Sequence, residues 1–287
     1  PTEQTQRLIA RGVPSPSLVR TTDGRLWVEY EGGAWRMLTW MDGQVHDKVT
    51  DPDLAREAGA LLGRFHVALR DFEYAFKSRR LGVHDTPKHL ANLEQALDTE
   101  RSCGAYDDVA PVGQAILNAA AELESLPPTP QRIVHGDPKV TNMIFDDGGR
   151  GHCMIDLDTL APMALPLEMG DALRSWCNPG GEDDAEAIFD AKLFAAAIDG
   201  YAHQTGDWLT PQERESLFLG ARTVAIELAA RFAADALLDC YFGWNKQKYP
   251  SRSAHNLVRA RSQLQLARSM AEQAPVAERA VRAAWSA

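Results

Sequence analysis

Short apolar runs separated by turn residues open the chain, and apolar residues at helical spacing fill the rest. Residues 26–30 and 35–40 are two apolar runs joined by Glu31-Gly32-Gly33, a pattern typical of a hairpin. After residue 42 the apolar period lengthens from two residues to three or four. The sequence therefore predicts an α+β fold, with a small strand-rich part over residues 1–42 and a large helical part over residues 43–287.

The helical part contains clear start signals and apolar faces. Asp51-Pro52 predicts a helix with proline in its first turn, and Thr210-Pro211-Gln212-Glu213 is a capping box that predicts the start of one long helix. The tail from Ala274 is expected to fray. Apolar residues recur at helical spacing over residues 54–69, 90–97, 112–123, 189–201, 217–232 and 257–270.

A second strand pattern interrupts the helices in the middle of the chain. Residues 143–145 and 153–155 are short apolar runs, and Asp146-Asp147-Gly148-Gly149 between them predicts a tight turn. The two open ends of such a hairpin lie close together in space. Asn142 and Asp156 occupy those ends and are therefore predicted to share one site.

The residues before this hairpin fit the chemistry of phosphoryl transfer. Asp137 can accept the proton of an attacking hydroxyl, while Asn142 and Asp156 can hold Mg²⁺ against the phosphates of a nucleotide. Lys139 either offsets the charge of the transferred phosphate or is a solvated loop lysine. His135 is predicted to support the loop through hydrogen bonds. The order His, Asp, Lys, Asn and then a second Asp is that of the protein-kinase catalytic loop.

These segments resemble the aminoglycoside phosphotransferase and choline kinase superfamily, and within it the N-acetylhexosamine 1-kinase-like group. That group has His-x-Asp-x-Lys-x-x-Asn followed by Ile-Asp-Leu-Asp-Thr, which this chain matches at residues 135–142 and 155–159. The chain departs from the group at Gly136, where a polar residue is usual, and at residues 161–169, which lack a Pro-Gly pair. Further similar segments are residues 84–86, 170–174, 178–179, 182–184, 231–235, 239–242 and 255–259.

The resemblance implies a protein-kinase-like fold of two lobes that transfers the γ-phosphate of ATP, with Mg²⁺, to a hydroxyl of a sugar or amino sugar, the anomeric hydroxyl included. It places a hinge at residues 39–43, where main-chain groups near Trp40 and Met41 would bind the adenine. The other interpretation of these two residues is that they are core residues of an edge strand. The small lobe is expected to be incomplete in this sequence, because no lysine precedes Lys48 and no glycine-rich loop precedes Leu26.

For the acceptor site the resemblance indicates a set of polar residues far apart in the sequence. Arg231 and Asp235 are four residues apart on a predicted helix, so they either contact the acceptor or pair with each other. Arg174 faces either solvent or the acceptor. Asp171 is expected to anchor the catalytic loop from a helix start, and Asp158 either joins the metal site or caps a turn. The acceptor set is His84, Asp85, Arg174, Arg231, Asp235 and Tyr241, and the supporting set is His135, Asp158 and Asp171.

Composition narrows the classes of protein further. The formal net charge of −10 argues against a surface that binds nucleic-acid polymers. No apolar run reaches the length of about 18 residues that a membrane span needs, so no membrane partner is expected. The four cysteines, at positions 103, 153, 177 and 240, have no paired short spacing and are typical of reduced thiols in a cytoplasmic protein.

Two classes of function remain open at this point. One is an ATP-dependent small-molecule kinase, and the other is a non-catalytic relative that binds a sugar-like ligand or a partner without transferring phosphate. The complete set of Asp137, Asn142 and Asp156 favours the kinase. Within the kinase class, the second candidate is an aminoglycoside kinase or an amino-alcohol kinase of the choline or homoserine type. A cationic acceptor of this kind needs an acidic pocket, which the charge balance permits.

Overall fold

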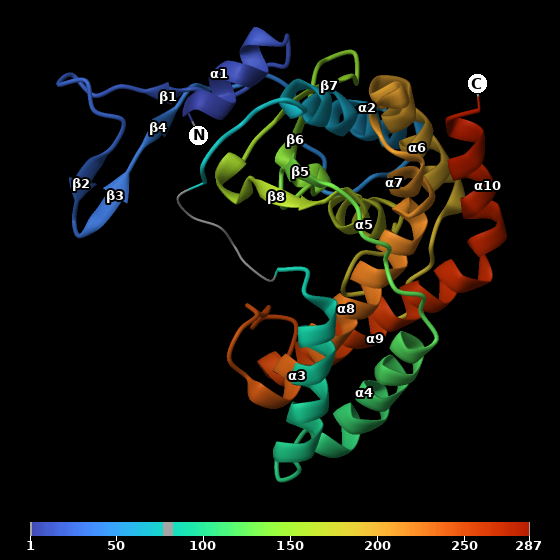
Figure 1. Cartoon of the computed structure of the whole chain (residues 1–287). Coiled ribbons are helices and arrows are strands. Elements are labelled where there is room, and N and C mark those ends of the chain that lie inside the picture. The colour runs from blue at the N-terminus through green and yellow to red at the C-terminus, as the bar shows by residue number, and fades with distance from the viewer. Residues whose placement is uncertain (1, 77–82, 287) are drawn as a thin grey trace.

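A computed structural model describes residues 2–76 and 83–286 in two parts of unequal size (Figure 1). The smaller part carries one helix and two short strand pairs, and the larger part is mainly helical. The predicted α+β fold of two lobes is therefore confirmed, whereas the boundary after residue 42 stays a prediction. Across the described residues, the structure contains no helix that is long and apolar enough to cross a membrane.

The strand-rich lobe follows the predicted hairpin but with shorter strands. Glu31 and Gly32 both have positive φ values, 49° and 75°, as a two-residue hairpin turn requires, so the predicted turn is confirmed. The run predicted as one strand over residues 35–40 is split at Arg36, because its two halves pair with different partners. The elements are α1 (Thr2–Ala10), β1 (Leu18–Val19) paired with β4 (Met37–Leu38), and β2 (Val28–Tyr30) paired with β3 (Gly33–Trp35).

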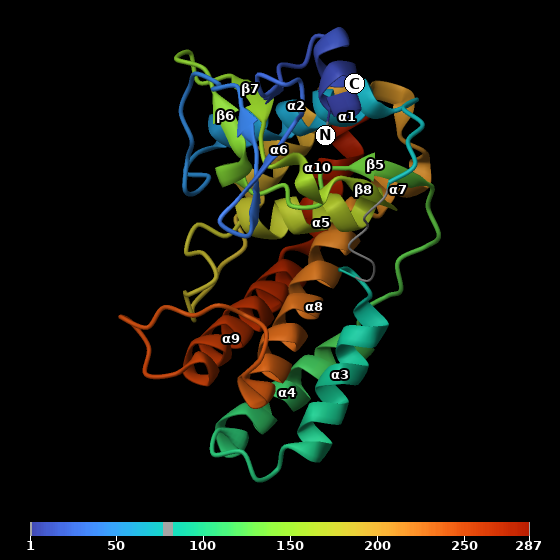
Figure 2. The same cartoon turned by 90° about the vertical axis from the view of Figure 1, so that its left-hand side faces the viewer.

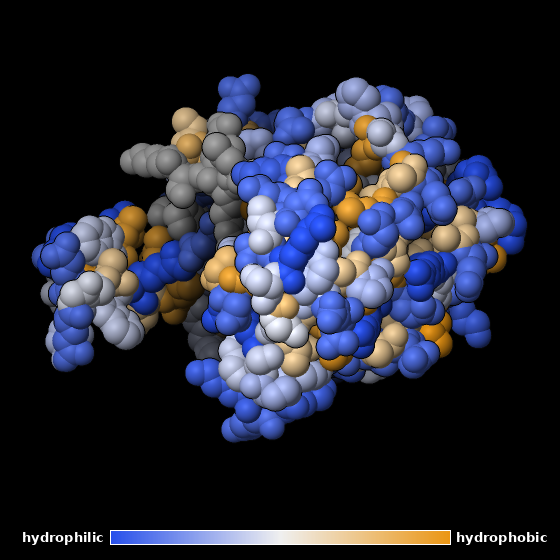
Figure 3. All heavy atoms as spheres, turned by 90° about the horizontal axis from the view of Figure 1, so that it is seen from below, coloured by the Kyte–Doolittle hydropathy of each residue, from blue (hydrophilic) through white to orange (hydrophobic). Residues whose placement is uncertain are grey.

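The strand-rich lobe contributes little to the main hydrophobic core. Seen from below, its β2–β3 hairpin lies at the left of the molecule, apart from the helical body, with apolar atoms on its surface (Figure 3). Leu8 and Val13 from this end of the chain join the core, which otherwise consists of residues of the large lobe. The large side chains that this lobe exposes are Trp27, Tyr30, Trp35, Met37 and Trp40.

The large lobe is built around one long buried helix, α8 (Leu217–Leu238). It packs against α3, α4, α5 and α9, and Figure 2 shows these helices gathered around it. The predicted capping box at Thr210 is confirmed, but the helix that it opens is short and α8 begins only after Ser216. The remaining helices of this lobe are α2 (Pro52–Leu69), α3 (Thr86–Thr99), α4 (Tyr106–Ala121), α5 (Leu165–Trp176), α6 (Ala191–Thr205), α7 (Pro211–Glu215), α9 (Arg252–Glu272) and α10 (Ala274–Ala284).

The last of these helices corrects one expectation. The segment from Ala274 was expected to fray, yet it forms α10, which packs against α6 and buries Ala277 and Val281. Its apolar residues are two valines and several alanines, and the absence of large apolar side chains led to the expectation of fraying. Burial against the neighbouring helix supplies the stability that the segment would lack alone.

Two short strand pairs lie on the large lobe and carry the predicted catalytic segment. β6 (Met143–Phe145) and β7 (Gly151–Met154) form the expected hairpin, in which Met143 lies opposite Met154. β5 (Gln131–Val134) pairs with β8 (Ala161–Ala164) beside it. Short 3₁₀ turns at Val140–Asn142 and Leu157–Thr159 follow the catalytic segment and the hairpin, and a third lies at Gly206–Trp208.

Helices α2 (Pro52–Leu69) and α6 (Ala191–Thr205) cross beneath this hairpin at very short range. Asp51 caps α2 as predicted, since its side chain accepts hydrogen bonds from the backbone N–H groups of Asp53 and Leu54. Gly59 makes the close approach possible, because a Cβ atom there would lie 2.0 Å from the carbonyl oxygen of Ala197. The crossing holds the helix that supports the hairpin against the rest of the lobe.

We expect Gly59→Ala to destabilise the fold. A methyl group at Gly59 must push apart two backbones, and overpacking of this kind costs about 1–3 kcal/mol, which exceeds or offsets the gain of about 1 kcal/mol in helix propensity. Denaturant unfolding followed by circular dichroism would measure the loss. Gly104→Ala is the matched control, because a Cβ atom there would meet nothing within 4 Å. Equal midpoints for the two variants would contradict the close crossing.

Candidate active site

The loop of residues 135–142, called the catalytic loop from here on, brings three of the predicted residues into direct contact. Lys139 Nζ lies 3.0 Å from Asp137 Oδ1. The side-chain amide of Asn142 donates to the main-chain oxygen of Asp137 at 2.9 Å and to its Oδ2 at 3.3 Å. With its N–H groups turned toward Asp137, Asn142 keeps its amide oxygen for another partner. The Asp137 carboxylate is thus fixed in place, and its side chain remains 24% exposed, within reach of a ligand.

Asp156 lies at the other end of the hairpin, as predicted. The N–H group of Ile155 donates to the carbonyl oxygen of Asn142 at 2.9 Å, which joins the two ends. Asp156 itself has left-handed backbone angles, φ 60° and ψ 53°, and its side chain is exposed. A non-glycine residue in this region is uncommon and is often found at functional sites.

Oxygen donors of this kind suit a hard divalent cation such as Mg²⁺. Within residues 2–76 and 83–286, no group of three His, Cys, Asp or Glu side chains is placed to hold a metal ion. A cation at the open end of the hairpin would therefore depend on Asn142 and Asp156 together with the oxygen atoms of a bound ligand. Magnesium sites that share a substrate phosphate have this composition, so the residues present fit the predicted role.

His135 supports the catalytic loop through hydrogen bonds of its buried ring, as predicted. Its Nε2 lies 2.8 Å from the carbonyl oxygen of Ile155, and its Nδ1 lies 3.3 Å from the backbone N–H of Asp137. The ring is fully buried, and burial lowers the pKa of His135 below its ordinary value. A neutral ring that donates from Nε2 and accepts at Nδ1 satisfies both contacts. His135 therefore connects the residue before Asp156 to the loop that carries Asp137.

Glu168 anchors the catalytic loop, a role that was not predicted. Its two carboxylate oxygens accept from the backbone N–H groups of His135 and Gly136, each at 3.0 Å. Its side chain is buried in the first turn of α5, and His66 Nε2 lies 3.7 Å from it. A carboxylate alone in the apolar segment 161–169 was the signal that could have identified Glu168.

The anchoring role was predicted for Asp171 instead. Asp171 lies further along α5, where Arg174 Nη2 donates to its Oδ1 at 2.7 Å. Arg174 Nη1 also donates to Glu182 Oε1 at 2.7 Å. Burial alone would raise the pKa of Asp171, but the positive charge of Arg174 outweighs burial and lowers it. Arg174 is buried, so the interpretation that it faces solvent is wrong.

Gly136 explains one departure from the resembling group. Its φ is 81°, and a Cβ atom would lie 2.4 Å from the carbonyl oxygen of Thr159. The Thr159 hydroxyl also donates to the carbonyl oxygen of His135 at 2.7 Å, so the two segments lie in contact. A polar side chain cannot fit here without moving the loop.

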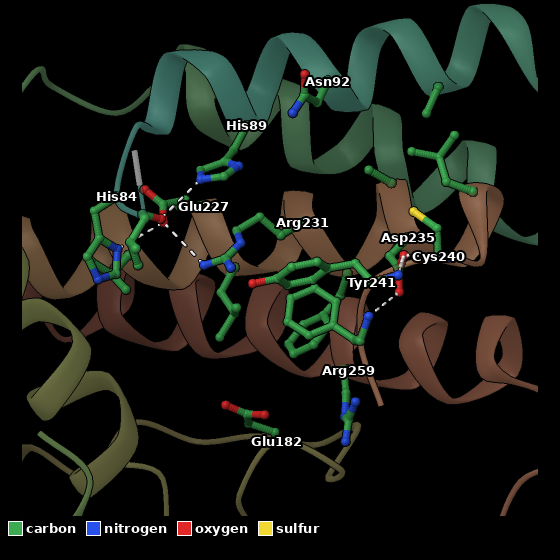
Figure 4. Close-up of a pocket in the computed structure, with 18 of the residues that line it drawn as sticks. His84, His89, Asn92, Glu182, Glu227, Arg231, Asp235, Cys240, Tyr241 and Arg259 are labelled. Atoms are coloured by element: carbon green, nitrogen blue, oxygen red, sulfur yellow. Dashed lines mark hydrogen bonds and ion pairs between the residues drawn. The ribbon is translucent and has the colours of Figure 1, made fainter. Parts of the chain in front are cut away.

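A cavity of about 1260 Å³ lies between the catalytic loop and the helices α3 and α8. Figure 4 shows its side chains converging from the two helices and from the segment after α8. Asp137 and Lys139 line it on the catalytic side. Of the predicted acceptor residues, the cavity wall includes His84, Arg174, Arg231, Asp235 and Tyr241. Asp85 instead caps α3, since its side chain accepts from the backbone N–H of Lys88 at 3.2 Å.

Glu227 organises the wall of the cavity that α3 and α8 share, and it was not predicted. Its carboxylate is fully buried and lies 2.9 Å from His84 Nδ1 and 2.7 Å from the hydroxyl of Thr86. Arg231 Nη1 lies 3.8 Å away (Figure 4). Burial alone would lower the pKa of His84, but the hydrogen bond and charge of Glu227 raise it above its ordinary value. The pair therefore favours a charged imidazolium facing the cavity.

Arg231 and Asp235 do not form the ion pair that their spacing allowed. The carboxylate of Asp235 accepts from the backbone N–H groups of Cys240, Tyr241 and Phe242, and from the side chain of Asn256. Asp235 thereby fixes the turn after α8. The guanidinium of Arg231 lies over the rings of Tyr241 and Phe242, at 5.9 and 5.5 Å from their centroids. Arg231 thus faces the cavity with an aromatic support.

The residues predicted for the hinge lie beyond the end of β4. Trp40 is 84% exposed and its indole N–H donates to Asp42 at 3.0 Å. The interpretation of Trp40 as a core residue of an edge strand is therefore wrong, and Met41, only partly buried, lies in no strand either. Main-chain contacts of these two residues with adenine stay a prediction. Asp158, predicted for the metal shell or a turn, forms an ion pair with Arg36 of the small lobe.

A two-lobe fold that brings Asp137, Lys139 and Asn142 together beside the hairpin end with Asp156 is typical of a kinase-like phosphotransferase. The chain belongs to the phosphotransferase enzyme family, whose family model matches residues 3–203. The predicted superfamily is thereby confirmed, as is the prediction that the protein is an enzyme. Membership of the N-acetylhexosamine 1-kinase-like group stays a prediction.

Solved structures with the same fold cover nearly all of the chain. The aminoglycoside phosphotransferase from Alicyclobacillus acidocaldarius subsp. acidocaldarius DSM 446 is 16% identical, with a TM-score of 0.59 over 95% of this chain and 82% of that chain. A microcompartment-associated aminopropanol kinase is 14% identical, with a TM-score of 0.59 over 97% and 82%. Amicoumacin kinase hAmiN, in complex with AMP-PNP, Ca²⁺ and Ami, is 15% identical, with a TM-score of 0.56 over 92% and 75%.

The anchoring role of Glu168 leads to a test on stability. Glu168→Gln keeps the side-chain shape but turns one acceptor oxygen into an NH₂ group that faces a backbone N–H. Because hydrogen bonds to charged groups contribute about 1.5–3 kcal/mol, we expect the free energy of unfolding to fall by about this amount. The backbone amides of His135 and Gly136 should also exchange faster with deuterium. Glu94→Gln on the exposed face of α3 is the control, and unchanged exchange in Glu168→Gln would refute the anchor.

Proposed function

We propose that this enzyme transfers the γ-phosphate of ATP, with Mg²⁺, to a hydroxyl group of a sugar or amino sugar. The observation that carries the proposal is the position of Asp137. Its carboxylate lines the large cavity on one side and contacts Asn142 on the other. An acceptor in the cavity and a nucleotide at the open end of the hairpin would therefore meet at Asp137.

The chain's own residues divide the work of phosphoryl transfer between them. Asp137 accepts the proton of the acceptor hydroxyl, and its contacts with Lys139 and Asn142 keep it oriented. The ammonium group of Lys139 is half exposed and offsets negative charge near the reacting oxygen. Asn142 and Asp156 would hold Mg²⁺, which when bound would neutralise the charge of the phosphates.

The structures of relatives support the use of a nucleotide and a divalent cation. The amicoumacin kinase of the same fold is in complex with the ATP analogue AMP-PNP and with Ca²⁺. Membership of the phosphotransferase family supports a phosphate donor as well. The choice of Mg²⁺ rests on the small set of two protein ligands, because Mg²⁺ keeps several ligands from water and phosphate.

The cavity supports a sugar-like acceptor through its mixture of groups. It presents the amides of Asn92 and Gln95, the guanidinium of Arg231, and the rings of Tyr241 and Phe242. Hydroxyl groups can pair with the first three, and the apolar face of a sugar ring can pack against an aromatic ring. The volume of about 1260 Å³ also leaves room for an acceptor larger than a simple amino alcohol.

A cationic acceptor is the second candidate, and one observation favours it. Six carboxylates line the cavity, those of Glu100, Asp137, Asp171, Glu182, Glu227 and Asp235, against the cations of Lys139, Arg174, Arg231 and Arg259 and the imidazole of His84. An aminoglycoside or amino alcohol of the choline or homoserine type would benefit from this excess of carboxylates. Most of these carboxylates already have partners, however, which favours the neutral sugar.

Asp137→Asn should lower turnover by about a hundred- to ten-thousand-fold, which is the usual contribution of a general base. Binding of ATP should persist, because the substitution leaves Asn142 and Asp156 in place. Phosphate transfer and calorimetric nucleotide binding would be measured on the same preparation. Asp147→Asn in the exposed hairpin turn is the control and should behave as the native protein. Full turnover in Asp137→Asn would remove Asp137 from the mechanism.

A screen of acceptors decides between the two candidates. Free hexoses, N-acetylhexosamines, kanamycin-type aminoglycosides, choline and homoserine would be offered with ATP and Mg²⁺, and phosphorylated product would be detected by mass spectrometry. We expect transfer to a hexose or hexosamine. Transfer to kanamycin-type compounds or choline, with none to any sugar, would establish the second candidate instead.

A further inference from the structure

Arg36 connects the two lobes at a point beside the predicted cation site. Its side chain projects from the residue between β3 and β4 and forms a two-pronged contact with the carboxylate of Asp158. Nη1 lies 2.7 Å from Asp158 Oδ1, and Nη2 contacts Oδ2. Asp158 lies only two residues after Asp156. A cation of the small lobe is therefore held next to the place where the phosphates of the proposed nucleotide would lie.

The ion pair between Arg36 and Asp158 contributes little to the stability of the fold, so another anion can replace Asp158. The side chains of Arg36 and Asp158 are 39% and 48% exposed, and exposed pairs contribute little net stability because water screens them. Arginine also presents a planar fork of N–H donors that matches phosphate as well as it matches a carboxylate. A ligand with several negative charges can therefore replace Asp158 at small cost.

The space for such an exchange is present. A second cavity, of about 630 Å³, is lined by Arg36 and Asp158 and by the strand-rich lobe, with Trp27 and Trp35 on its wall. The negative charges of Asp156 and Asp158 would repel the phosphates of a nucleotide. Lys139, the cation of the catalytic loop, lies 3.0 Å from Asp137 and is engaged there. Arg36 is thus the cation that the small lobe offers at this end of the site.

We propose that Arg36 is a phosphate-binding residue that leaves Asp158 for the triphosphate when the nucleotide binds. The inference rests on the proposed function, since it requires a nucleotide at the open end of the hairpin. Asp158 then acts as a competitor that holds Arg36 in the empty enzyme. The exchange breaks one charge-assisted contact and forms another, so it adds a phosphate contact without exposing an unpaired arginine.

The two partners of the pair should have opposite effects on nucleotide affinity. Arg36→Gln removes the fork, so the dissociation constant for ATP should rise about tenfold, as expected for the loss of one charge-assisted hydrogen bond. Asp158→Asn removes the competitor, so the same constant should fall several-fold. Arg36→Lys keeps the charge without the fork and should lie between Arg36→Gln and the native protein. Adenosine, which lacks phosphates, should bind all variants equally.

Isothermal titration calorimetry with ATP and Mg²⁺, and separately with adenosine, would make these measurements without relying on turnover. Arg25→Gln is the control, since Arg25 forms an ion pair with Asp23 on the same exposed segment. Weaker ATP binding in both Arg36→Gln and Asp158→Asn would show that the pair is only a latch between lobes and would overturn the inference. Unchanged ATP binding in Arg36→Gln would overturn it as well. Absence of ATP binding by the native protein would instead refute the proposed function, and this inference with it.

Discussion

The contact of one carboxylate with two backbone N–H groups determines whether this site can exist. Glu168 holds the amides of His135 and Gly136, and the adjacent residue is Asp137. The loop at this point has a glycine in a left-handed conformation and no regular structure to fix it. A buried carboxylate is a strong acceptor, and each of its two oxygens accepts one of these amide N–H groups. The position of Asp137 therefore depends on α5, the helix that carries Glu168, and on the packing of α5 against α8.

Short-range chemistry made the catalytic hairpin and loop predictable from the sequence. The turn at Asp146-Asp147-Gly148-Gly149 and the spacing of Asp137, Asn142 and Asp156 are local patterns, and the structure brings these three residues into the expected arrangement. Glu168 and Glu227 escaped prediction for the opposite reason. Their hydrogen-bond partners lie 32 or more residues away in the sequence, so no local pattern around either carboxylate marks the contact.

The wrong or displaced assignments share a physical cause. Helical spacing allowed Arg231 to pair with Asp235. In the structure the Asp235 carboxylate instead accepts hydrogen bonds from three backbone N–H groups and one side-chain amide. The sequence left open whether Arg174 faces solvent, whereas in the structure its guanidinium is buried in ion pairs with Asp171 and Glu182. Tertiary contacts decide which of several possible partners a charged side chain takes. The sequence alone shows which partners a charged side chain could take, but not which of them it takes in the fold.

One wall of the large cavity takes the spacing of its polar side chains from a single helix, α8. Glu227, Arg231 and Asp235 lie four residues apart along one face of α8 (Figure 4), so they span about 12 Å at the rise of an α-helix. Insertion or deletion of one residue between them would turn the later side chains by roughly 100° and point them away from the cavity. A change in the length of α8 between these residues therefore removes the later side chains from this wall of the cavity, whereas a change in α3 or in the segment after α8 leaves their alignment intact.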